Sequence, residues 1–134
     1  MKFEVFNVVC FKKKDLEKTL EKLFPEKKEM VVNVIFVSED EMRQLNKDFR
    51  SRDEVTDVLS FKISDKISEI YICSEYIKKG FENFEKEIIR MIIHGVLHIK
   101  GYEHKGYFQE DDINEEFFHL QEERLKKFYD ILEK

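Results

Sequence analysis

Three of the four histidines of this chain lie within the eleven residues from His94 to His104. His94 and His98 are four residues apart, so on an α-helix both imidazoles project from the same face, one turn apart. Gly101 can adopt the left-handed conformation that ends a helix, which lets the chain turn and present His104. Three imidazole ligands and one open position are typical of a catalytic zinc site. The spacing therefore favours a metal site over a helix that merely carries histidines.

The glycine after the first histidine limits the chemistry of this site. The order His-x-x-x-His-x-x-Gly-x-x-His is also the ligand spacing of zinc metalloproteases of the metzincin type. Those enzymes carry a glutamate directly after the first histidine as general base, whereas this chain has Gly95, so peptide hydrolysis by that mechanism is disfavoured. A glycine inside a helix costs about 1 kcal/mol relative to alanine. We hypothesise that Gly95 leaves room beside the metal for a bulky anionic group. The alternative is that it permits close packing of the helix.

A second polar cluster runs from Arg50 to Asp57, between a predicted helix and a predicted strand, where functional loops are common. Arg50 and Arg52 can each bind a phosphate through two parallel hydrogen bonds, which a lysine cannot do. Asp57 is the first residue of the predicted strand. It could orient a histidine ligand through a hydrogen bond without binding the metal itself. Each of these residues taken alone could equally be an exposed charge or a turn residue.

Composition bounds the size and class of the protein. A chain of 134 residues, 42% hydrophobic and 40% charged, is long enough for one domain with a single core, so residues 1–134 are expected to form one domain. The formal net charge of −5 argues against a protein that coats nucleic acid through bulk electrostatics. It leaves open a nucleic-acid enzyme that uses a local basic patch and a metal.

Two isolated cysteines indicate the compartment. Cys10 and Cys73 belong to no Cys-x-x-Cys pair, and their apolar surroundings predict free, buried thiols. With no signal peptide and no long apolar segment, the chain is expected in the reducing cytoplasm and not in a membrane.

Hydrophobic periodicity predicts the elements that would position these residues. Strands are expected at residues 2–9, 31–37, 57–63 and 69–73, the last two as a hairpin. Helices are expected from about residue 13 to Pro25, after a capping box at Ser38 and Glu41, from about 83 to 100, and from about 110 to 132. A short helical or turn segment is expected before Gly80. The second helix would bury Met42, Leu45 and Phe49. The fold class is α+β: a four-stranded mixed sheet packed with about five helices, with the metal site on the central helix and the turn after it.

Taken together, the two polar stretches resemble the YbeY family of metal-dependent endoribonucleases, also called rRNA maturation factors. The run from His94 to His104 is similar to one signature of that family, and the run from Arg50 to Phe61, with its Thr-Asp-Val-Leu-Ser-Phe, is similar to a second. Departures are conservative for the most part: Val55 replaces a usual proline, Ile99 a leucine and Glu103 an aspartate. The order of predicted elements agrees from end to end.

The resemblance implies a zinc-dependent enzyme, with one Zn²⁺ per chain, that cuts single-stranded RNA. It further implies a role in maturation of the small-subunit rRNA 3′ end and in ribosome quality control, with ribosomal proteins or the small subunit as partners. On this view His94, His98 and His104 hold the metal, and Arg50 and His94 are the catalytic residues. A basic track for the RNA is then required, and its candidates are Arg43, Lys47, Arg52, Lys100 and Lys105.

Two alternatives remain open at this point. One is a metallohydrolase of another substrate class on the same ligands, although Gly95 counts against a peptidase. The other is a non-catalytic, zinc-containing ribosome assembly factor. All three hypotheses predict a bound metal, so metal binding alone does not separate them. The fourth histidine, His119, lies in an acidic helix and is expected at the surface.

Overall fold

The structure is a computed structural model of the chain and describes residues 1–101 and 114–134. Nine elements follow one another in these ranges: β1 (Lys2–Phe6), α1 (Lys13–Leu23), β2 (Val31–Phe36), α2 (Glu39–Arg50), β3 (Val58–Lys62), β4 (Ile67–Ile72), α3 (Ser74–Gly80), α4 (Phe84–Ile99) and α5 (Asn114–Leu132). The predicted start of the last helix at residues 110–113 lies outside the described residues.

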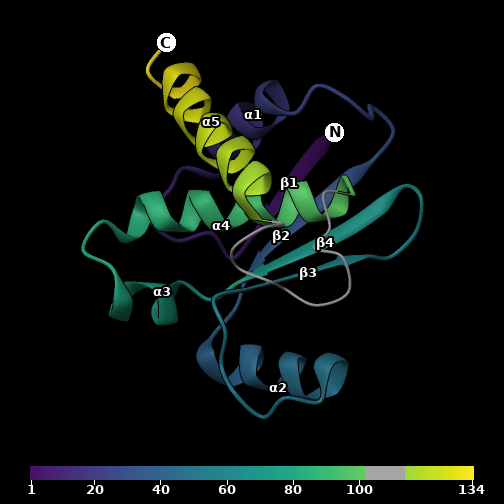
Figure 1. Cartoon of the computed structure of the whole chain (residues 1–134), viewed down its shortest axis with the longest axis vertical. Helices are drawn as coiled ribbons and strands as arrows, with labels where there is room; N and C mark the ends of the chain where they lie inside the picture. Colours follow the sequence, from purple (N-terminus) through teal and green to yellow (C-terminus); the bar gives the residue numbers. More distant parts are fainter. Residues whose placement is uncertain (102–113) are drawn as a thin grey trace.

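A single mixed sheet forms the centre of the fold, with the strand order β1-β2-β4-β3 (Figure 1). The strands β1, β2 and β4 are parallel, whereas β3 runs antiparallel to β4 as its hairpin partner. The α+β prediction of a four-stranded mixed sheet with about five helices is therefore confirmed. Within the described chain, β3 pairs with one strand only, so it forms one border of the sheet.

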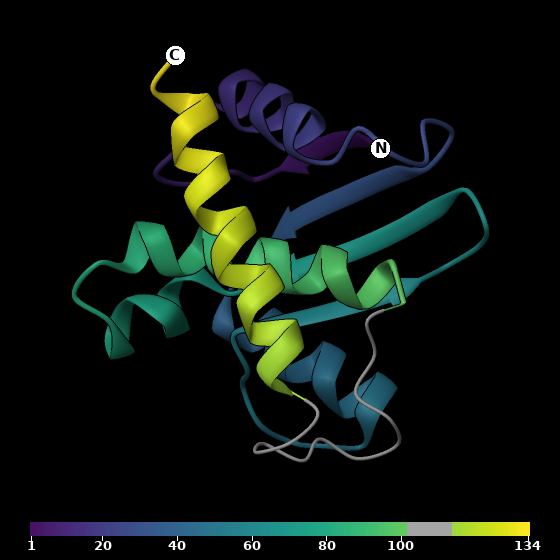
Figure 2. The same ribbon diagram turned by 45° about the horizontal axis from the view of Figure 1, so that its top comes forward.

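Helices cover the two faces of the sheet unequally. Alternate side chains of β2 and β4 face α1, α4 and α5 in one large core, which includes Val34 and Ile70. The intervening side chains, among them Ile35 and Tyr71, face a smaller cluster around Met42 of α2. Figures 1 and 2 show α5 crossing over α4 on the large-core side, with α2 on the other side of the sheet. The two predicted polar stretches thus approach the sheet from opposite faces.

The ligand helix α4 is the most deeply buried helix of the fold. Five of its side chains are completely inaccessible to solvent: Ile88, Ile89, Ile92, Ile93 and Val96. Burying one such side chain stabilises the fold by roughly 1.5–3 kcal/mol. The position of α4 against the sheet is therefore fixed by packing alone.

The helix α2 begins as the sequence predicts but faces the sheet differently. The Ser38 hydroxyl accepts a hydrogen bond from the Glu41 N–H at 3.1 Å, and the Glu41 carboxylate accepts one from the Ser38 N–H, which completes the capping box. The prediction that Phe49 is buried is wrong, because its ring is 66% exposed. The buried position in the later part of the helix is instead Asn46, one turn after Met42.

Several other predictions need correction at element ends. The first strand ends at Phe6 because Asn7 has a left-handed backbone with φ of 56°. Cys10, predicted as a buried thiol, is exposed, whereas Cys73 is buried as expected. Ile63 follows the end of β3 and is 57% exposed. Across residues 1–101 and 114–134, no helix combines the length and apolar character that a membrane crossing requires.

Candidate metal and phosphate site

The histidine pair on α4 has the geometry of two ligands directed at one point. The Nε2 atoms of His94 and His98 lie 3.0 Å apart, and the ring centroids are 4.6 Å apart. Two nitrogen atoms bound to one tetrahedral zinc at 2.0–2.1 Å are separated by roughly 3.3 Å, so the pair fits such an ion with a small adjustment. Gly101 follows the helix with a φ of +97°, the left-handed conformation predicted for it. His104, the predicted third ligand, lies outside the described residues.

A buried glutamine on α5 fixes the orientation of His94. The Nδ1 of His94 lies 2.8 Å from Oε1 of Gln121, whose side chain is only 5% exposed. The amide nitrogen of Gln121 donates to a carboxylate oxygen of Glu122 at 3.3 Å, so the amide oxygen is the atom that faces the imidazole. Because an oxygen can only accept, His94 must carry its hydrogen on Nδ1 and present a lone pair at Nε2. That is the tautomer required of a metal ligand bound through Nε2.

The glutamine is held in turn by an ion-pair network between α4 and α5. The Arg90 guanidinium donates to both carboxylate oxygens of Glu122, at 2.8 and 3.0 Å, and also contacts Glu87. These contacts lower the pKa of Glu122 against the opposing effect of its partial burial and raise the pKa of Arg90. Both groups are therefore charged at neutral pH, and the network locks the crossing of the two helices beside the histidines.

Aromatic packing restricts the remaining freedom of the histidine rings. Phe117 of α5 is 6% exposed, and its ring centroid lies 5.0 Å from that of His94 and 5.1 Å from that of His98. Burial lowers the pKa of His94, while its hydrogen bond to Gln121 and the charge of Asp57 act in the opposite direction. A neutral imidazole is the form that binds metal, so the burial favours the ligand state.

Gly95 faces the sheet and not the histidine side of the helix. A Cβ atom at this position would lie 3.1–3.2 Å from three side-chain atoms of Ile70 on β4. The structure therefore supports the packing alternative for Gly95. It gives no support to the hypothesis that this glycine leaves room for an anionic group beside a metal.

A groove joins the histidine pair to the second polar stretch. Its lining follows the strand β3, with His94 and His98 on one side and Arg50, the last residue of α2, on the other. The volume of the groove is about 390 Å³. Arg50 is exposed and has no ion-pair partner in the described ranges, so its guanidinium is available to an anion. The predicted association of the histidines with Arg50, far apart in sequence, is thus seen in the fold.

The loop between α2 and β3 is anchored so that Arg50 and Asp57 border the same groove. The side-chain amide of Asn46 donates to the Glu54 carbonyl at 2.9 Å, and the Cys73 N–H donates to the Asp57 carbonyl at 3.0 Å. The Asp57 carboxylate accepts hydrogen bonds from the Val58 N–H at 2.8 Å and from a neighbouring threonine hydroxyl. Asp57 therefore acts on His94 through its charge, and Gln121 is a direct hydrogen-bond partner of that histidine.

The predicted basic track is only partly assembled. Arg43 binds Asp53 through two hydrogen bonds, at 2.7 and 3.3 Å, so its charge is already compensated. Arg52 lies 3.8 Å from Glu54 in a loose, exposed pair. The side chain of Lys100 is 11% exposed and lies 2.5 Å from Glu26, on the α1 side of the molecule, so its charge is already compensated. Lys47 is exposed as expected, and Lys105 lies outside the described residues.

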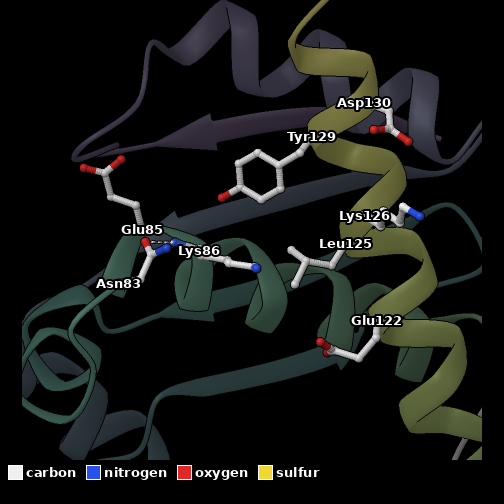
Figure 3. Close-up of a pocket in the computed structure, with 8 residues that line it drawn as sticks. All are labelled: Asn83, Glu85, Lys86, Glu122, Leu125, Lys126, Tyr129 and Asp130. Carbon is white, nitrogen blue, oxygen red and sulfur yellow. Dashed lines mark hydrogen bonds between the residues drawn. The ribbon is translucent and has the colours of Figure 1, made fainter.

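A larger cleft, of about 630 Å³, lies elsewhere on the surface, between the beginning of α4 and the helix α5. Figure 3 shows Leu125 and Tyr129 projecting from α5 toward Asn83 and Lys86. Its lining contains no histidine or cysteine, and its charges are of both signs. The chemistry of the residues, and not the size of the cleft, identifies the smaller groove as the candidate site. His119 is exposed, as predicted, and borders neither.

The donor set fits a metal ion of the zinc type as far as it is described. The described ranges alone contain no group of three or more metal-ligating side chains, and the third predicted histidine, His104, lies outside them. The fold and groove together define an α+β protein with a paired-histidine, arginine-bordered site.

Comparisons with known proteins show the family to which the chain belongs. A family model described as Endoribonuclease YbeY matches residues 6–129. An endoribonuclease YbeY from Thermotoga petrophila is 43% identical over 104 residues, which cover 73% of this chain and 67% of that protein. Another, from Phytoplasma australiense, is 35% identical and covers 95% of both chains. A solution structure from Thermotoga maritima is 33% identical with a TM-score of 0.67, covering 95% of this chain and 89% of that one. The chain belongs to the endoribonuclease YbeY family.

Proposed function

We propose that this member of an endoribonuclease family is a zinc-dependent enzyme that cuts single-stranded RNA. We further propose that it works in the cytoplasm, in maturation of the small-subunit rRNA 3′ end and in ribosome quality control, with the small subunit or its proteins as partners. One observation carries the chemical part of this proposal. The converging Nε2 atoms of His94 and His98, 3.0 Å apart, share one groove with Arg50, which forms no ion pair among the residues that the structure describes.

The proposed metal would be held by His94, His98 and His104. Bound zinc at such a site supplies Lewis-acid chemistry, by withdrawing electron density from a phosphoryl oxygen. The surrounding residues prepare the ligands for it: Gln121 fixes the hydrogen of His94 on Nδ1, and Phe117 restricts both described rings. The site is therefore preorganised by hydrogen bonding and packing, which reduces the reorganisation that metal binding requires.

Arg50 would bind the phosphate that is cut. Its guanidinium can donate two parallel hydrogen bonds to non-bridging phosphate oxygens and stabilise the negative charge that grows there during the reaction. Asp57, on the same groove, places a negative charge that disfavours binding of a second phosphate beside it. The phosphate that is cut would therefore lie between the histidine pair and Arg50, which line opposite sides of the groove.

The proposed function is tested by incubating the zinc-loaded protein with a short single-stranded RNA and, separately, with a peptide mixture. His98→Ala and Arg50→Ala should each reduce RNA cleavage at least about 100-fold, the usual effect of removing one group that stabilises transition-state charge. Arg43→Ala is the matched control, because Arg43 is an arginine of the same helix that is compensated by Asp53. It should cleave RNA at close to the rate of the unmodified protein.

Three other outcomes would contradict the proposal. RNA binding without cleavage by the loaded protein would favour a non-catalytic assembly factor. Cleavage of peptides alone would indicate a hydrolase of another substrate class. Cleavage that persists equally in His98→Ala and Arg50→Ala would show that the groove is not the active site, or that a contaminating ribonuclease is being measured.

A further inference from the structure

A row of three aromatic side chains leads away from the groove on its α2 side. We call Phe49, Phe61 and Tyr71 the aromatic row. The ring centroids of Phe49 and Phe61 are 5.1 Å apart with a tilt of 50°, and those of Phe61 and Tyr71 are 6.0 Å apart. Phe61 itself lines the groove together with Arg50 and the histidine pair. The row is therefore continuous with the candidate active site.

The outermost ring of the row is exposed beyond what packing requires. Phe49 is 66% exposed, although it lies in the last turn of α2 next to Arg50. The small core under α2 is filled by Met42 and its neighbours, and among the described residues Phe49 makes one ring contact, with Phe61. Proteins that bind single-stranded nucleic acid combine an exposed aromatic ring, which stacks on a base, with a basic side chain, which contacts the backbone.

We propose that Phe49 and Phe61 form a stacking site for a nucleobase of single-stranded RNA, next to the phosphate bound at Arg50. This inference rests on the proposed function of the groove. The two residues Phe49 and Arg50 are adjacent in sequence, so the stacked base and the bound phosphate belong to neighbouring positions of one RNA strand. Phe61 lines the groove and contacts Phe49, so the proposed stacking site adjoins the proposed phosphate position.

Charge around the row supports an RNA strand as its occupant. Arg50 follows Phe49 directly in α2, whereas the exposed Lys47, two residues before Phe49, projects from the other side of the helix. Neither makes an ion pair within the described ranges. A stacking contact needs no hydrogen-bond partner on the base edge, and neither phenylalanine offers one. The site should therefore accept all four bases with modest preference.

The absence of tryptophan from the chain makes a direct test available. Phe49→Trp creates a protein with a single tryptophan at the exposed end of the row, and stacking of a base on an indole quenches its fluorescence. The matched control is Phe81→Trp, at a residue 48% exposed in the connection between α3 and α4. The probe is a short single-stranded RNA added by rapid mixing, so that fluorescence is recorded before cleavage. A second RNA carries abasic sites along the same backbone.

We expect strong quenching for Phe49→Trp with the normal RNA, little with the abasic RNA, and none for Phe81→Trp with either. Equal quenching by both RNAs would overturn the proposal, because the contact would then be with the backbone. Absence of quenching at saturating RNA would overturn it as well.

A second variant keeps the proposal testable if the indole disturbs the helix. Phe49→Leu preserves an apolar side chain over Phe61 but removes the stacking surface. RNA binding should weaken roughly 5- to 150-fold, the range for loss of one base–aromatic stack, with kcat and the melting temperature nearly unchanged. An unchanged KM would refute the stacking site while leaving the nuclease function intact. If the unmodified, zinc-loaded protein cleaves no RNA, the proposed function is refuted, whatever the fluorescence shows.

Discussion

Replacement of Gln121 by leucine tests the argument that a buried amide orients His94. Leucine fills a similar volume but accepts no hydrogen bond, so the Nδ1–H of His94 would lose its partner, 2.8 Å away, in a site where Gln121 is only 5% exposed. A buried donor left without a partner costs about 1–3 kcal/mol. Loss of an outer partner of a metal-bound histidine typically costs 10- to 100-fold in metal affinity, or about 1.4–2.7 kcal/mol. These two free-energy ranges agree, so we expect Gln121→Leu to weaken zinc binding by 10- to 100-fold.

The assay is a zinc titration in competition with a chromophoric chelator, together with urea unfolding of the metal-free protein. Gln44→Leu is the matched control, because Gln44 is an exposed helical glutamine that bonds only Asp48 among the described residues. It should leave zinc affinity unchanged. If Gln121→Leu folds normally and binds zinc as tightly as the control, the inferred role of Gln121 is wrong.

Two further perturbations follow from contacts inside the fold. Gly95→Ala should lower the free energy of unfolding by about 1 kcal/mol in urea denaturation, because crowding against Ile70 outweighs the gain in helix propensity. Adding Ile70→Val to this variant should restore part of the lost stability. A Gly95→Ala protein more stable than the unmodified protein would contradict the packing argument. Burial and the hydrogen bond to Glu69 raise the pKa of Tyr71 to about 12. Its contribution to stability is complete below pH 10 and is lost between about pH 10 and 12; Glu69→Gln should lower the Tyr71 pKa in an NMR titration, and no change would contradict the assignment.

Local sequence patterns predict much of this fold because they act over short distances. The capping box at Ser38 and the left-handed Gly101 each depend on a few neighbouring residues, and the structure contains both. The i, i+4 spacing of His94 and His98 is likewise a property of one helix. Phe49 is predicted to be buried because it continues the apolar stripe of α2 by one turn. The small core under α2 ends before that turn, so the ring is exposed.

Partners on distant elements were not predictable in the same way. Lys100 meets Glu26, 74 residues earlier, and Gln121 meets His94 only because α5 crosses over α4. The sequence did contain one signal for the second contact. Gln121 is a polar residue within the buried stripe of α5, between Phe117 and Leu125, and such a residue needs a partner inside the protein.

The burial of α4 has a consequence for how the protein acquires its proposed metal. In small structural zinc domains, metal binding supplies the folding free energy, so the ion is chosen as the chain folds. Here the helix that carries His94 and His98 is fixed by its own apolar side chains, five of which are wholly buried. The folding of this helix therefore does not depend on the proposed metal. If the proposed site takes up its ion after folding, competition among available metals would decide which ion is bound, and we expect that protein prepared without metal can be reconstituted with each candidate in turn.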